Sequence, residues 1–129
     1  MILSFDQAGE ILDDLYETFP EALFDGLNGG VSLLPDLKTD PQLPGRTMYL
    51  MGAYCHDMMG RYIQLYYGSF AALAKEENWT RADWEQELYQ TLSHELTHHV
   101  EGLAGLRGLE VKDEEQIAQW KAEDGPEAE

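Results

Sequence analysis

The sequence has little cysteine, little positive charge and no long apolar run. Its single cysteine, Cys55, excludes an intramolecular disulfide and a four-cysteine zinc site. Only 8 Lys and Arg stand against 25 Asp and Glu, which gives a formal net charge of −17 at pH 7. A nucleic-acid surface needs clustered cations, and an anionic membrane repels so acidic a chain. We therefore expect neither nucleic acid nor a membrane as a partner.

The chain is long enough for one domain with its own core. It has 129 residues, of which 43% are hydrophobic. No apolar stretch approaches the roughly 20 residues of a membrane span, and the acidic start lacks the basic region of a signal peptide. We expect a cytoplasmic protein with one domain over residues 1–122, followed by an acidic tail at 123–129 that frays.

Two capping patterns predict the main helices. Ser4–Gln7 and Thr80–Asp83 each place a hydroxyl residue three positions before a side chain that can bond back to it. The first helix is expected to end at Phe19–Pro20, where proline breaks the apolar periodicity. The second is the longest in the chain, and we expect it to run from residue 81 to about Gly102 or Gly105.

The residues between these helices predict short strands and turns. The expected elements are a short helix through residues 20–27, a strand at Val31–Leu34, a surface loop over 35–46, a hairpin of Met48–Tyr54 and Arg61–Tyr67 around a turn at Cys55–Gly60, and a brief helix capped by Gly68–Ser69 before the charged residues 75–78. Helices combined with a small sheet indicate the α+β class.

One stretch of the long helix carries residues suited to metal chemistry. His94 and His98 are four residues apart, so they lie on one face, and Glu95 directly follows the first. Neutral imidazoles bind Zn²⁺, and a catalytic site adds a third protein ligand and one water. Glu95 then suits the role of general base and later acid. The alternative is that the three residues are only part of a solvated helix face.

The helix also has an apolar arc and a polar side. The arc is formed by Trp84, Leu88, Tyr89, Leu92, Leu96, Val100 and Leu103. The polar side is expected to hold Gln86, Gln90, Ser93 and Thr97. His99 points toward the arc, so we expect a core residue, whereas His56 falls in the predicted turn and should be exposed.

The predicted strands contribute further candidates. Tyr62, Gln64 and Tyr66 alternate with Ile63, Leu65 and Tyr67, which is typical of a half-buried sheet. A strand edge can pair with an extended peptide, and a tyrosine is a candidate hydrogen-bond donor to an oxyanion. The four methionines of this region are expected to fill the core: Met48, Met51, Met58 and Met59.

The run Tyr49–Trp120 resembles the small bacterial zincin-like metallopeptidase family. The likeness lies in the strand around Gly52, the strand Tyr62–Gly68 and the helix Thr91–His99. It implies a zincin-like single domain, with a small twisted sheet of about three strands packed on helices and a long helix that carries the HExxH motif. It also implies a zinc-dependent peptidase.

The third metal ligand is open, because the chain departs from the family pattern HExxHxxGxxD. Glu101 and Ala104 stand where that pattern has its glycine and its aspartate. Asp113 is one candidate, since residues 108–117 resemble the family's Gly-to-Asp stretch displaced by an insertion. Glu101 is the other, because helical side chains lean back toward the N-terminus. Asp113 also fits the N-cap of a last helix. The lesser alternatives are Glu110, Glu114 and a site without a third protein ligand.

The expected function is peptide hydrolysis with Zn²⁺ as cofactor. The substrate would be a peptide or an unfolded protein segment, held in an open cleft because so small a domain has little chain for a deep pocket. The alternative is a catalytically inactive zincin-like domain that serves as a metal-binding or acidic protein-interaction module. A third possibility is a hydrolase that uses the same residues on another substrate.

Overall fold

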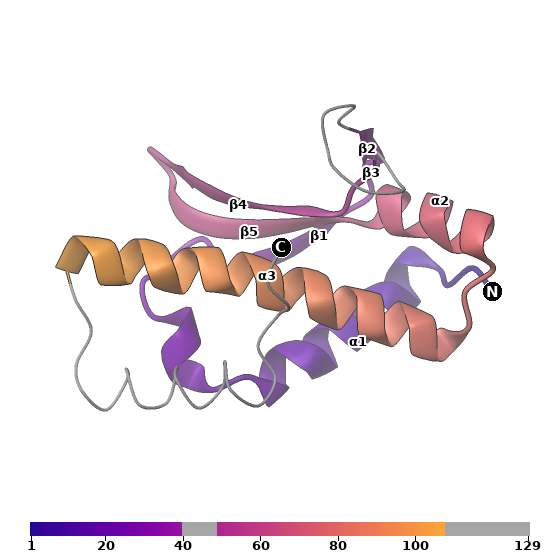
Figure 1. The fold of residues 1–129 in the computed structure, drawn as a ribbon, viewed down its shortest axis with the longest axis horizontal. Helices are drawn as coiled ribbons and strands as arrows, with labels where there is room; N and C mark the ends of the chain where they lie inside the picture. The colour runs from indigo at the N-terminus through magenta and orange to yellow at the C-terminus, as the bar shows by residue number, and fades with distance from the viewer. Residues whose placement is uncertain (40–48, 108–129) are drawn as a thin grey trace.

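The computed structural model describes residues 1–39 and 49–107, and these form an α+β fold (Figure 1). In chain order the elements are α1 (Phe5–Thr18), the 3₁₀ helix η1 (Glu21–Phe24), β1 (Val31–Leu34), β2 (Lys38–Thr39), β3 (Tyr49–Leu50), β4 (Gly52–Asp57), β5 (Gly60–Tyr66), α2 (Tyr67–Glu77) and α3 (Arg81–Arg107). The predicted class and a sheet of three strands are therefore confirmed.

The main sheet has the order β1-β5-β4, with β5 in the centre. β1 runs parallel to β5, and β4 runs antiparallel to it. Helices α1 and α3 lie below one face of this sheet in Figure 1, and the β4–β5 hairpin projects over the later part of α3. Ile63 and Leu65 of β5 are fully buried, which places the core between the sheet and the helices.

Both predicted caps are present. The Ser4 hydroxyl accepts from the Gln7 amide at 3.1 Å, and the Gln7 side chain accepts from the Ser4 amide at 2.9 Å. Thr80 and Asp83 form the same reciprocal pair at 3.2 and 2.9 Å. The starts of α1 and α3 are therefore confirmed, whereas α3 continues to Arg107, beyond its predicted end.

The β4–β5 turn is tighter than predicted. Asp57 pairs with Gly60, so only Met58 and Met59 form the turn, and residues 55–57 belong to β4. Gly60 has φ +108, a backbone conformation that favours glycine. Met58 and Met59 are 103% and 80% exposed, so the prediction that they fill the core is wrong. A two-residue turn at the end of a projecting hairpin has no second layer to pack against.

Asp57 holds this turn in place. Its carboxylate accepts from the Met59 amide at 2.8 Å and from the Tyr62 hydroxyl at 2.6 Å. The hydrogen bond to the carboxylate raises the pKa of Tyr62 to about 12 and lowers the pKa of Asp57 below its ordinary value.

Four other predicted elements differ from those observed. The short helix at 20–27 is only the four residues of η1, and Lys38–Thr39 of the predicted loop form strand β2. Tyr67 begins α2 instead of ending a strand, and α2 includes the charged residues up to Glu77. Ser69 does not cap α2. It is fully buried, and its hydroxyl bonds both the amide and the carbonyl of Lys38 at 3.0 Å.

Two predictions fall on residues without a structural description, namely the acidic tail 123–129 and the segment around Asp113. Met48 also lies outside the described residues, and Met51 packs against the core. In the ranges 1–39 and 49–107, no helix combines the length and apolar character that crossing a bilayer requires.

Candidate metal centre

The two histidines of the motif meet on the surface of α3. The Nε2 atoms of His94 and His98 lie 3.1 Å apart, and their rings are nearly perpendicular at 87°. Two imidazole nitrogens bound to a tetrahedral metal at about 2.0 to 2.1 Å are about 3.4 Å apart. The pair therefore has a spacing within a few tenths of an ångström of two ligands on one ion.

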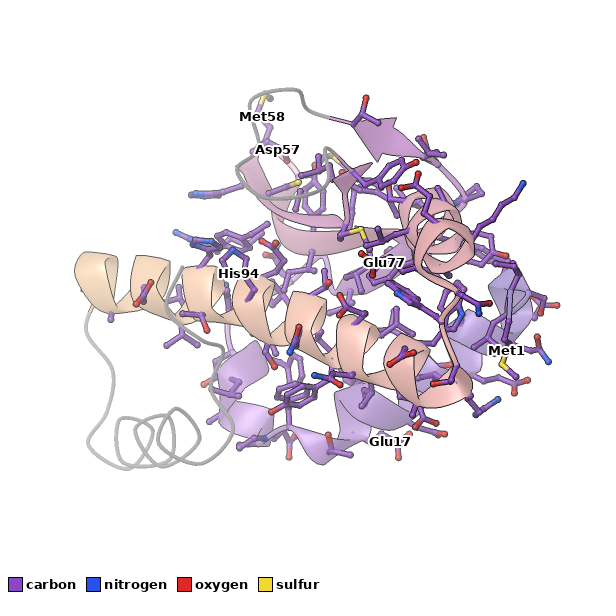
Figure 2. The ribbon with its side chains drawn as sticks, turned by 45° about the vertical axis from the view of Figure 1, so that its right-hand side comes forward. Met1, Glu17, Asp57, Met58, Glu77 and His94 are labelled. Carbon is purple, nitrogen blue, oxygen red and sulfur yellow. The ribbon has the colours of Figure 1, made fainter. Side chains whose placement is uncertain are left out.

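The three motif residues differ in exposure. His98 is exposed and His94 is half-buried, whereas Glu95 is only 8% exposed. Figure 2 shows His94 on the flank of α3 nearer to the sheet. Glu95 is buried because α3 is covered by the sheet and by two other elements, α1 and η1.

The described residues supply two ligands and not a third. Among residues 1–39 and 49–107, no three His, Cys, Asp or Glu side chains gather in a way that would hold a metal ion. Glu101 is exposed on the turn that follows His98. Asp113, Glu110 and Glu114 lie outside the described residues. The identity of the third ligand stays a prediction.

His99, which follows the candidate ligand His98, is the centre of a buried chain of hydrogen bonds. It is 0% exposed, so its prediction as a core residue is confirmed. Its Nε2 lies 2.6 Å from the carbonyl oxygen of Asp25, and its Nδ1 lies 3.0 Å from the hydroxyl of Tyr54. Arg61 Nη1 donates to that hydroxyl at 2.7 Å.

With a neutral His99, the partners fix the direction of every bond in this chain. A carbonyl oxygen only accepts, so His99 Nε2 carries the proton and donates to Asp25. The Nδ1 atom then accepts from Tyr54, whose oxygen accepts from Arg61. Bonds aligned in one direction reinforce one another. The ligand-bearing turn of α3 is thereby held to β4, to β5 and to the residue after η1.

Sequence reasoning missed Tyr54, Arg61 and Asp25. It weighed Tyr62 and Tyr66, which alternate with the buried Ile63 and so lie on the other face of the sheet. Tyr54 stands opposite Ile63 in the register, on the face toward α3. No local pattern indicates a bond between residues 45 positions apart, as Tyr54 and His99 are.

Ser93 was predicted on the polar side of the helix, and this is wrong. It is fully buried, and its hydroxyl oxygen has no hydrogen-bond partner in the described part of the chain. The buried arc of α3 is wider than an apolar stripe predicts, because the sheet, α1 and η1 all pack on this one helix.

Strand β4 forms the sheet edge that lies along α3. A side chain at Gly52 would place its Cβ 2.9 Å from Thr91 Cγ2 and 3.0 Å from the Gln64 carbonyl oxygen. Glycine at this position thus allows the helix to approach the strand closely. The approach sets β4 beside the turn of α3 that precedes His94.

Comparisons with known proteins find a relative among the solved structures. No family model matches the chain, and neither does any curated protein. A solved structure of a conserved hypothetical protein from Thermo thermophilus is 36% identical, with a TM-score of 0.64 over 79% of this chain and 98% of that one. At this identity and coverage, the chain belongs to the same family as the Thermo thermophilus protein.

Proposed function

We propose that this protein is a zinc-dependent peptidase with a zincin-like domain. His94 and His98 bind Zn²⁺, and Glu95 is the general base and then the general acid. The observation that carries the proposal is the approach of the two Nε2 atoms to 3.1 Å, with a buried carboxylate on the next residue. An acid from Asp113 or Glu101 completes the ligand set.

Each residue has a defined task in this proposal. A bound Zn²⁺ would polarise the scissile carbonyl and lower the pKa of a water molecule. Glu95 takes the proton of that water and later transfers it to the leaving amine. The bond from His99 to the Asp25 carbonyl oxygen, and the bond it accepts from Tyr54, hold the turn of α3 that carries His98.

The substrate class follows from the strand beside the helix. β4 is at the edge of the main sheet, so its outer backbone groups suit an extended peptide that adds as a further strand. This favours peptides or unfolded protein segments over compact substrates. A net charge of −17 also favours substrates with positive charge near the cleft. We propose the cytoplasm as the site of action.

Glu95→Gln tests the reaction. The amide keeps the size of the side chain and removes its proton-accepting role, so peptide hydrolysis should fall by about a hundredfold or more while bound zinc is unchanged. Glu85→Gln is the matched control, because it makes the same change in an exposed ion pair on the same helix. Hydrolysis at the wild-type rate by zinc-loaded Glu95→Gln would refute the proposal.

One observation favours the alternative of an inactive metal-binding or acidic interaction module. After His98 the sequence has Glu101 and Ala104 where the family pattern has its glycine and its aspartate ligand, and a catalytic zinc site uses three protein ligands. Metal analysis of protein purified without added zinc separates the two functions. Less than about a tenth of an equivalent at neutral pH would favour the inactive module.

A further inference from the structure

Basic groups gather at one end of this acidic protein. Arg61 stands opposite His56 in the β4–β5 register, so both side chains lie on the sheet face toward α3. Tyr54 on the same face connects Arg61 to His99. The region thus brings an arginine close to the helix that carries the other three histidines of the chain.

Arg61 is a cation with unused hydrogen-bonding capacity. It is half-buried, and in the described ranges no carboxylate lies within ion-pair distance of its guanidinium. One of its five N–H groups donates to the Tyr54 hydroxyl. A partly desolvated guanidinium is costly unless an anion lies beside it. The position therefore suits an anion that comes from outside.

The distance from the guanidinium to the histidine pair matches one or two residues of an extended peptide. Its Nη1 is 3.5 Å from the place that a Cβ on Gly102 would occupy. Gly102 follows His98 by four residues, which is about 6 Å along the helix axis. A peptide spans at most about 3.6 Å per residue, so a scissile carbonyl near the histidines puts a terminal carboxylate near Arg61 after one or two residues.

We infer that Arg61 binds the C-terminal carboxylate of the substrate, so that the enzyme releases one or two residues from the end of a peptide. The inference rests on the proposed peptidase function and names its substrate class. A planar guanidinium matches a carboxylate with two parallel hydrogen bonds, which a lysine does not provide. Tyr54 orients the guanidinium through the bond already in place.

Peptides of one sequence with a free or an amidated C-terminus test the inference. With zinc-loaded wild-type protein, kcat/KM for the free acid should exceed that for the amide by about tenfold to a hundredfold, the strength of a charge-assisted hydrogen bond. Arg61→Gln should bring this ratio close to one, and Arg61→Lys should restore part of it. Arg81→Gln, the same change at the exposed start of α3, should leave the ratio intact.

A purely structural role for Arg61 predicts a different result. Tyr54→Phe removes the hydroxyl between Arg61 and His99 and leaves the guanidinium in place. If Arg61 serves only that network, Arg61→Gln and Tyr54→Phe each lower kcat/KM for the free-acid peptide and for the amidated peptide by the same factor. A preserved ratio in Arg61→Gln would therefore overturn the inference. Equally fast cleavage of the free acid and of an amidated peptide with a glutamate near its end would also overturn it, because a side-chain carboxylate would then serve as well as the terminal one.

Binding separates this inference from the peptidase proposal. The two peptides are titrated into Glu95→Gln and into Glu95→Gln with Arg61→Gln by calorimetry. Tighter binding of the free acid by about tenfold, lost in the double variant, supports the carboxylate site even where neither peptide is cleaved. Equal binding together with equal hydrolysis overturns the carboxylate site and leaves the peptidase proposal standing.

Discussion

The two ends of α3 are held by different forces. Near its start, Trp84 is fully buried, and its ring contacts lie at centroid distances of 5.4 to 6.4 Å from three aromatic neighbours: Tyr67, Phe70 and Trp79. Near the histidine pair, the buried contacts of His99 include hydrogen bonds to Asp25 and Tyr54. Apolar burial is strong and non-directional, whereas hydrogen bonds fix orientation. Stability and site geometry should therefore respond to different substitutions.

Trp84→Ala should have the largest effect, and mainly on stability. Loss of a buried tryptophan lowers the free energy of unfolding by about 3 to 5 kcal/mol, and the indole also donates to the Met1 carbonyl at 3.1 Å. Denaturant unfolding measures the loss, and zinc binding by the folded fraction should be close to that of the wild type. A loss below about 1 kcal/mol would contradict the conclusion that apolar burial stabilises this end of α3.

His94→Ala should affect the metal and spare the fold. Removal of a direct ligand should weaken zinc binding by about a hundredfold or more, beyond the loss known for groups that only orient ligands. Added zinc should then no longer raise the unfolding midpoint as it does for the wild type. His56→Ala is the control, since His56 is exposed in β4. An equal loss of zinc affinity in both variants would contradict the assignment.

His99→Leu should lower stability by about 1 to 3 kcal/mol. The change keeps the core filled but leaves the Asp25 carbonyl and the Tyr54 hydroxyl without their buried partner. Denaturant unfolding of His99→Leu, Tyr54→Phe and the double variant gives the interaction energy between the two side chains. The double variant should lose less than the sum of the single losses. Strictly additive losses would mean that the two side chains act independently.

Ser93→Ala should have the smallest effect, and in the opposite direction. It removes a buried hydroxyl that has no hydrogen-bond partner in the described residues and favours the helix, so stability should rise by up to about 1 kcal/mol. Ser69→Ala is the matched control, since that serine is equally buried but bonds Lys38 twice. Thermal unfolding compares the two, and a loss in Ser93→Ala as large as in Ser69→Ala would be inconsistent with an unpaired hydroxyl.

Local patterns predicted the parts of this fold that depend on near neighbours. The Ser4–Gln7 and Thr80–Asp83 caps are four-residue signals, and both helices start where these signals place them. The spacing of His94 and His98 likewise predicted two side chains on one face, and their Nε2 atoms meet at 3.1 Å. The turn between β4 and β5 was predicted over residues 55–60, but its tight form at Met58 and Met59 was not, because neither residue has a turn preference of its own and Asp57 provides the bonds.

Contacts between distant residues were beyond such patterns. The bond from His99 to the Asp25 carbonyl spans 74 positions, and the burial of Ser93 depends on which elements pack on α3. Arg61 was named only as the first residue of a predicted strand, and the register places it opposite His56 on the side facing the helix. These features depend on tertiary packing, which overrides local preference.

The strand order has a consequence for how the chain assembles during synthesis. The partner of β1 is β5, and Val31 pairs with Ile63, so β1 leaves the ribosome 32 residues before its partner. At about 5 to 20 residues per second, this is a delay of about 2 to 6 s. The β4–β5 hairpin closes locally within about 1 to 10 μs. The hairpin that carries Arg61 and Tyr54 thus forms the template on which the earlier strand docks.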